Sequence, residues 1–171
     1  MFLITFSSIE IFISSSGFDV ARCGSEEEPC KTMWKGMENM EIGTGMKTIQ
    51  IEGSTTIRDS FNVSNYQIKK GVKMGEEDTK AILNFEKAVG GQLEYFMEND
   101  IHLELRNTQL QLTSGFDNSA KTIISNKGGD LVISGCAFHS EAKVNNGFDC
   151  VFVDAIGGNV EVNDEKSFTQ E

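Results

Sequence analysis

Three segments in the second half of the chain decide the fold: HLELRNTQL at 102–110, DLVISGCAF at 130–138 and NVEVNDEKSF at 159–168. When the segments are aligned on their apolar residues, Leu103, Leu131 and Val160 coincide, at offsets of 131 − 103 = 28 and 160 − 131 = 29 residues. The stretches 123–125 and 152–154 repeat at the same 29-residue offset, so one repeat holds at least two strands. The chain therefore contains an internal repeat of short strands.

A repeat of this length, built from strands alone, favours a solenoid in which each coil stacks on the previous one. The pairs Gly128-Gly129 and Gly157-Gly158 recur at the repeat length and support that interpretation. An antiparallel sandwich is the alternative, but its hairpins need turn dipeptides such as Asn146-Gly147, which most of the strands here lack. We therefore predict an all-β parallel β-helix, with apolar ladders inside and polar ladders outside.

Length and charge exclude several classes of protein. The 171 residues, 39% of them hydrophobic, suit one domain over 1–171. Nucleic-acid binding depends on clustered Lys and Arg, whereas this chain has a formal charge of −11 and three arginines, so we expect no nucleic-acid partner. No window approaches the roughly 18 apolar residues of a membrane-spanning helix. We therefore expect no membrane-spanning segment.

The N-terminal stretch MFLITFSSIEIFISSSG is a poor secretory signal, because it lacks a basic start and contains Glu10. Its alternating Ile9, Ile11 and Ile13 instead predict a strand with one buried face. Further short strands bounded by turn residues are expected at IQI (49–51), FNV (61–63), VKM (72–74), AILNF (81–85) and LEYFM (93–97).

One short helix is predicted between the first strand and the others. Pro29 suits its first turn and Gly43 its end. Apolar residues at helical spacing lie between them: Met33, Trp34, Met37 and Met40. We expect this apolar face to cover the open end of the sheets as a capping helix. Residues 9–45 then hold the first strand, the cysteine loop and the capping helix, and 46–171 hold the coils.

The run IEIFISSSGFDVARCGSEEEPCKTMWKGM (9–37) resembles the opening of right-handed β-helix domains of the pectin lyase-like superfamily. There, a first strand leads through a Cys-Gly…Pro-Cys-Lys-Thr loop to an amphipathic capping helix. It is especially similar to large repetitive β-helix surface proteins of some single-celled eukaryotes, and GGDLVISGCAF (128–138) resembles their coils. The resemblance implies a right-handed β-helix and an extracellular or cell-surface location. It implies no particular activity, because the superfamily includes lyases, hydrolases, esterases and adhesins.

Cys23 and Cys30 close a small loop. In an oxidising compartment they would form a disulfide that fixes the entry to the helix, and in a reducing one they would remain thiols. Their spacing does not match a zinc site, and we expect no metal or cofactor. Cys136 is expected to point into the core. Asn62 begins the sequon Asn-Val-Ser and is a glycosylation candidate if the chain is exported.

The predicted outward ladders are His102/Asp130/Asn159, Glu104/Val132/Glu161 and Arg106/Ser134/Asn163. Glu104 and Glu161 would lie two coils apart, about 9.6 Å, at the upper limit for a pair of glycosidase carboxyl groups. Val132 separates them, so we predict no catalytic pair.

Other polar groups are equally weak candidates for chemistry. His102 and His139 have no recognisable nucleophile and orienting acid nearby in sequence. The acidic runs at 26–28 and 76–78 lack the spacing of a calcium loop.

Two hypotheses of function follow. The first is a non-catalytic secreted or cell-surface module, structural or adhesin-like, whose outward polar residues make weak contacts with glycan or protein. Those residues are Gln50, Asn62, Glu104, Gln109 and Gln111. The alternative is a carbohydrate-active enzyme, a polysaccharide lyase or hydrolase, or a degenerate relative of one. Because Glu171 closely follows the last repeat strand without a capping element, we also expect the sequence to be truncated at its C-terminus.

Overall fold

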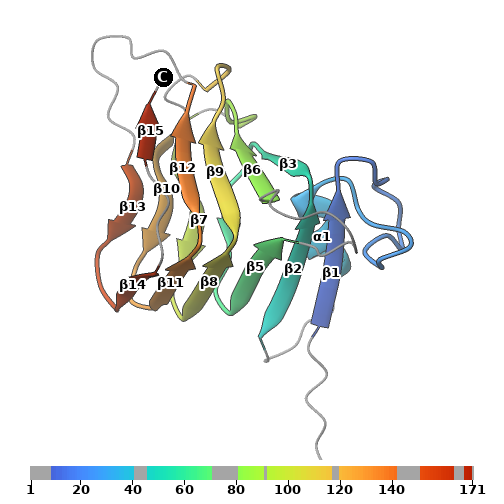
Figure 1. The fold of residues 1–171 in the computed structure, drawn as a ribbon, viewed down its shortest axis with the longest axis horizontal. Coiled ribbons are helices and arrows are strands. Elements are labelled where there is room, and N and C mark those ends of the chain that lie inside the picture. Colours follow the sequence, from blue (N-terminus) through green and yellow to red (C-terminus); the bar gives the residue numbers. More distant parts are fainter. Residues whose placement is uncertain are drawn as a thin grey trace, which may run out of the picture.

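The protein is seen here in a computed structural model that describes residues 9–40, 46–70, 81–90, 92–116, 120–141, 151–163 and 168–170. Its strands form three parallel sheets around a common core (Figure 1). The first sheet contains β1 (Ile9–Ser14), β2 (Lys47–Glu52), β5 (Tyr66–Lys70), β8 (His102–Arg106), β11 (Asp130–Ser134) and β14 (Val160–Asn163). The second contains β3 (Ser54–Ile57), β6 (Ala81–Phe85), β9 (Thr108–Leu112), β12 (Ala137–Ser140) and β15 (Phe168–Gln170). The third contains β4 (Phe61–Asn62), β7 (Leu93–Asn99), β10 (Ala120–Asn126) and β13 (Val151–Ala155).

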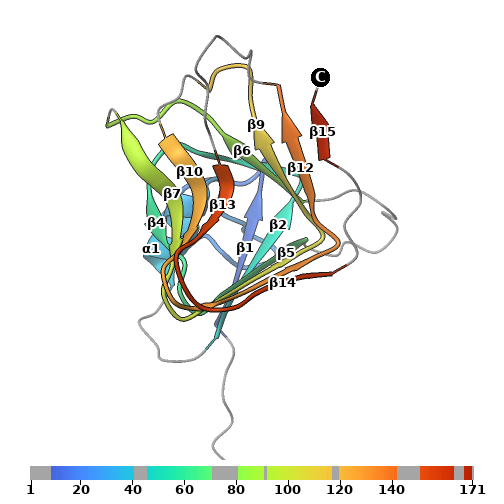
Figure 2. The same ribbon diagram turned by 90° about the vertical axis from the view of Figure 1, so that its left-hand side faces the viewer.

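From β2 onward the chain visits the first, second and third sheets in turn and then begins the next coil (Figure 2). Every strand pairs in parallel with its equivalent in the neighbouring coil. This arrangement confirms the predicted parallel β-helix and excludes the antiparallel sandwich. The strands predicted at 49–51, 61–63, 81–85 and 93–97 coincide with β2, β4, β6 and β7, whereas 72–74 lies outside the described residues.

The register of the first sheet confirms the repeat found in the sequence. Leu131 lies opposite Leu103 on one side and Val160 on the other. On the outer face, Val132 lies between Glu104 and Glu161, as the predicted ladder requires. Since the apolar pairs coincide in both steps, the 28- and 29-residue offsets correspond to one coil each.

The core is a stack of inward ladders. One ladder of the first sheet consists of Ile11, Ile49, Ile68, Leu105, Ile133 and Val162. Its first five members are buried, and each such side chain contributes about 1.5–3 kcal/mol by leaving water. Cys136 is also buried in the core, as predicted.

Two asparagines at the corner between the third and first sheets are fully buried. The Asn99 amide donates to the Asn126 side-chain oxygen at 2.7 Å, and the Asn126 amide donates to the Gly129 and Gly157 carbonyls at 2.8 and 3.0 Å. These bonds satisfy main-chain groups that the corner would otherwise leave unpaired inside the protein. The asparagines therefore tie three consecutive coils together.

The corner between the first and second sheets needs a left-handed residue. Gly53, Asn107 and Gly135 occupy it in three coils with φ of 74°, 49° and 62°. Glycine and asparagine tolerate this conformation best, which explains why they recur at this corner.

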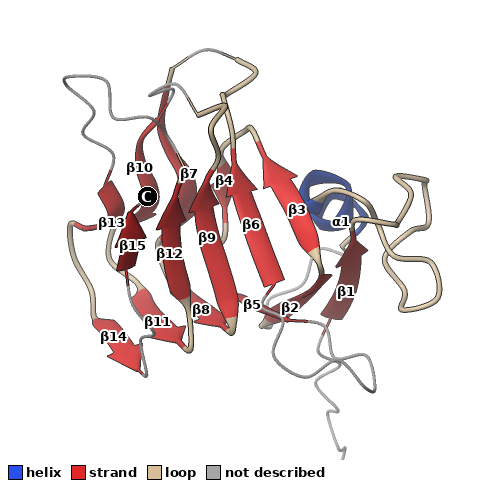
Figure 3. Ribbon diagram, turned by 45° about the horizontal axis from the view of Figure 1, so that its top comes forward, coloured by secondary structure: helices blue, strands red, loops and turns tan. Residues whose placement is uncertain are grey.

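The predicted capping helix is present as α1 (Met33–Asn39), which contacts β1 and β3 at one end of the solenoid (Figure 3). It begins later than predicted. Thr32 is the N-cap and accepts a hydrogen bond from the Lys35 amide, so Pro29 lies in the preceding loop rather than in the first turn. The helix ends at Asn39 with Met40 as its C-cap, and Gly43 lies outside the described residues.

The predicted core face of α1 is wrong in one residue. Met33 and Met40 are buried, and Met37 packs against the core, but Trp34 is 58% exposed. Consecutive helical residues point about 100° apart, so Met33 and Trp34 cannot both face the sheets. Gly36 completes the inner face, where an added Cβ would lie 3.2 Å from Ile13.

Candidate functional site

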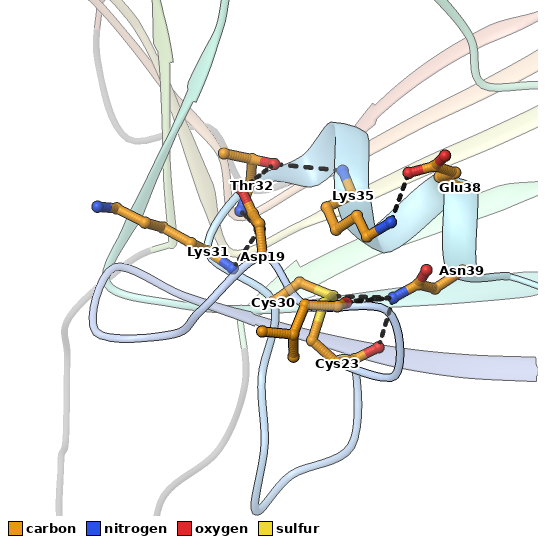
Figure 4. Close-up of polar contacts among 9 residues, drawn as sticks. Asp19, Cys23, Cys30, Lys31, Thr32, Lys35, Glu38 and Asn39 are labelled. Carbon is orange, nitrogen blue, oxygen red and sulfur yellow. Dashed lines mark hydrogen bonds and ion pairs between the residues drawn. A yellow bond between two sulfur atoms is a disulfide. The ribbon is translucent and has the colours of Figure 1, made fainter.

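The loop that precedes α1 is fixed by covalent and polar contacts (Figure 4). Cys23 and Cys30 form a disulfide with a Cα–Cα distance of 4.8 Å. The Asn39 amide reaches from the end of α1 to the Cys23 carbonyl at 3.0 Å. Asp19 accepts hydrogen bonds of 2.9 Å from the main-chain amides of Lys31 and Thr32. These contacts fix the position of the helix.

The same loop covers the outer edge of β1. The Phe12 amide donates to the Gly24 carbonyl, the Cys30 amide donates to the Phe12 carbonyl, and the Ser14 amide donates to the Cys30 carbonyl, each at 2.9 Å. These bonds satisfy a strand edge that would otherwise be open to another chain. The cysteine loop and α1 (residues 15–40, here the capping segment) thus protect both the edge and the core.

Glu104 is the acidic residue most engaged on the outer face of the first sheet. Its carboxylate accepts hydrogen bonds from the Gln67 amide and from Arg106, whose Nε lies 2.6 Å away. Burial acts to raise the pKa of Glu104, but the hydrogen bonds from Arg106 and Gln67 outweigh it and hold the pKa below its usual value. A carboxylate held in this way stays ionised near neutral pH and is poorly suited to act as a general acid.

Glu161, the other carboxylate of this ladder, lies apart from Glu104. Glu161 lies two strands away on β14, with Val132 between them, and accepts a hydrogen bond from Asn163 at 2.8 Å. The two carboxylates therefore belong to separate contacts on the sheet.

The two histidines also lie apart. His102 is on β8 of the first sheet, and His139 is on β12 of the second sheet, with its Nε2 3.7 Å from the Glu141 carboxylate. They do not form one site.

The five outward residues expected to make a binding flank lie on three different faces. Gln50 and Glu104 are on the first sheet, Gln109 and Gln111 on the second, and Asn62 on the third. The sequence pattern could not separate them, because outward positions look alike in all three strands of a coil. Gln109, Gln111 and Glu141 do form one row, since the Gln109 amide donates to Gln111 at 2.8 Å and the Gln111 amide to Glu141 at 2.7 Å.

Asn62, the glycosylation candidate, is exposed on β4. Its amide lies 3.3 Å from the Asp100 carboxylate, and its side-chain oxygen accepts from the Ser64 amide. The position is accessible from solvent, and modification of it stays a prediction.

Among the described residues, no three His, Cys, Asp or Glu side chains are grouped as metal ligands. The acidic residues at 26–28 are exposed in the capping segment, and those at 76–78 lie outside the described residues. The part of the chain that the structure describes also contains no helix long and apolar enough to cross a membrane.

A pocket of about 640 Å³ lies between the capping segment and the coil formed by β2, β3 and β4. Sequence reasoning missed it. Its walls include Trp34 from α1 and Phe61 from β4, whose ring centroids are 5.7 Å apart. The one signal in the sequence was the single tryptophan, which was assigned to the core.

The geometry defines the class of protein as a parallel β-solenoid with a disulfide-linked N-terminal cap. The chain matches no protein-family model, no curated protein and no solved structure at a significant level. The three stacked parallel sheets are compatible with a β-helix.

Proposed function

We propose that this chain is a non-catalytic secreted or cell-surface β-helix module, structural or adhesin-like, that makes weak contacts with glycan or protein. The observation that carries the proposal is the state of Glu104. The outward carboxylate best placed for chemistry is engaged by Arg106 and Gln67, and its ladder neighbour is Val132. Because the charged groups of this outer face pair with neighbours on the same sheet, the face suits a stable surface better than a reactive one.

The disulfide between Cys23 and Cys30 supports the proposed extracellular or cell-surface location. Disulfides persist in oxidising compartments and are rare in the cytosol. Alkylation of the protein from its native source, with and without prior reduction, tests this part. Two thiols that react only after reduction are the expected result, and two that react beforehand would contradict the location.

A carbohydrate-active enzyme of the pectin lyase-like superfamily is the second candidate, favoured by the motif at 9–37. The two proposals are separated by incubating the protein with polyuronates and following the unsaturated product by its ultraviolet absorbance. We expect no product with the wild type. Turnover that Glu104→Gln abolishes and Glu161→Gln preserves would establish the enzyme instead.

A further inference from the structure

The pocket between the capping segment and the first complete coil has the dimensions of a small-molecule site. Its volume of about 640 Å³ lies within the roughly 300–1,000 Å³ that is usual for ligand pockets. It exists because β3 is the last strand of the second sheet at this end, where α1 packs in place of another strand. A helix does not fill the space beside a strand edge as a strand would, and a hollow remains.

One wall of the pocket is aromatic. Trp34 is 58% exposed, and Phe61 supports it from β4 with the two rings tilted by 46°. Val89, which is also exposed, extends this apolar wall. An indole face carries negative electrostatic potential and attracts weakly positive C–H groups, which one face of a pyranose ring presents.

The facing wall is formed by β3, where Ser54 and Thr56 lie on the outer face and Thr55 lies on the buried face with Ile57. Thr55 is only 3% exposed, and its Oγ1 is the one buried side-chain polar atom without a hydrogen-bond partner in the described part of the chain. This hydroxyl is covered by the protein, so the hydroxyl groups of β3 that a ligand in the pocket can contact are those of Ser54 and Thr56.

The charges around the pocket balance. Lys31, Arg58 and Asp59 line it, and Arg58 is paired with Glu86, its Nε lying 2.9 Å from the carboxylate. Two cations and two carboxylates leave no net attraction for an anion. They do offer fixed donors and acceptors, which match neighbouring hydroxyl groups on a neutral sugar ring.

We propose that this pocket binds a neutral saccharide whose ring stacks on Trp34 and whose hydroxyl groups contact Thr56, Arg58 and Asp59. The inference rests on the proposed function in taking glycan as the class of ligand. It differs in placing the contact at the cap, between α1 and β3, instead of on the flanks of the sheets.

The single tryptophan makes the test direct, because all indole fluorescence of the protein comes from Trp34. The folded protein is titrated with cellotriose, maltotriose and β-1,4-galactotriose in turn. At least one of them is expected to shift the emission to shorter wavelength and to protect Trp34 from acrylamide quenching. Unchanged emission and quenching with all three would overturn the proposal.

Two variants test the polar wall while keeping the fluorescent reporter. Thr56→Val preserves shape and removes an exposed hydroxyl group of β3, and Asp59→Asn removes an acceptor charge. Each is expected to weaken saccharide binding by roughly three- to tenfold, the effect of one lost hydrogen bond. Melting curves of the free variants show that the fold is intact. Unchanged affinity in both variants would overturn the assignment of the site.

Gln109→Ala tests the competing location of the site, the flank of the second sheet. It should leave binding unchanged if the pocket is the site. If saturation-transfer NMR shows saccharide binding that Gln109→Ala reduces while Trp34 does not respond, the pocket proposal fails and glycan binding on the flank stands. If neither Trp34 fluorescence nor saturation-transfer NMR detects a saccharide, the result would count against glycan binding as a whole.

Discussion

The two ends of the described solenoid carry equivalent residues in opposite environments. Ile11 at the N-terminal end and Val162 on β14 belong to the same inward ladder, yet Ile11 is 5% exposed and Val162 is 45% exposed. Val160, in the neighbouring ladder, is 40% exposed. The capping segment covers Ile11, whereas no described element covers the outer side of β14. Whether an inward side chain is buried in this fold therefore depends on a further layer packed over its strand, and not on the residue type.

The comparison also shows what a cap must provide. At β1 it supplies main-chain partners through Gly24 and Cys30 and an apolar cover through Met33. Both are needed, because a coil exposes strand edges and core at the same time. We therefore expect stability to be concentrated at the covered end and in the middle coils.

The largest contrast is expected between the two ends of one ladder. Ile11→Ala should lower the free energy of unfolding by about 2–5 kcal/mol, because it leaves a cavity beneath the cap. Val162→Ala should lower it by less than about 1 kcal/mol, because its side chain is already half in water. Urea unfolding followed by circular dichroism measures both. Ile11→Val serves as the graded control, and equal effects of the two alanine variants would refute the comparison.

Asn126→Ala should have the next largest effect, a loss of about 2–3 kcal/mol, since it removes the side-chain donor to the buried Gly129 carbonyl and to the half-buried Gly157 carbonyl. Asn163→Ala is the matched control, because Asn163 is an exposed asparagine on β14. The control should change stability by less than about 0.5 kcal/mol. An Asn126→Ala variant as stable as the control would show that the corner bonds are dispensable.

Removing the disulfide should destabilise the covered end by about 2 kcal/mol, given the short loop that it closes. The double variant Cys23→Ser with Cys30→Ser is compared with the wild type by urea unfolding, with and without dithiothreitol. Reductant should lower the stability of the wild type to that of the variant and leave the variant unchanged. A wild type insensitive to reductant would contradict a structural role for this bond.

The smallest expected effect concerns Glu104 and pH. Its folded-state pKa is lowered, so the unfolded state binds more protons as the pH falls. The stabilisation from Glu104 is complete above the unfolded pKa near 4.5 and is lost as the pH drops through the lower folded value. Glu104→Gln should flatten this part of the pH profile of unfolding, with a change of about 1 kcal/mol or less. Glu161→Gln on β14 is the control, and a profile unchanged by Glu104→Gln would refute the role.

Much of the fold was predictable because the repeat can be recognised from local patterns of apolar residues in the sequence. Leu103, Leu131 and Val160 align in the sequence because they stack in space. The disulfide of Cys23 with Cys30 was one of two stated outcomes, and the buried position of Cys136 followed from its place in a strand.

The candidate sites were predicted less well. The exposure of Trp34 was missed because the helical pattern alone did not show which apolar residues face the core. The burial of Asn99 and Asn126 was missed because an asparagine near a turn usually indicates a solvent-exposed position. The pocket was missed because it depends on how α1 packs beside β3 and β4, which no local sequence pattern reports.

The sequence by itself determined the class of fold and the register among β8, β11 and β14, because side chains alternate in a strand and recur at each coil. Only the tertiary structure decided which of three faces each outward residue occupies and where a pocket opens beside β3. Periodicity distinguishes inward from outward side chains. The direction in which a sheet faces depends instead on corners such as Gly53 and Gly135. The pocket depends on how a helix packs beside a strand.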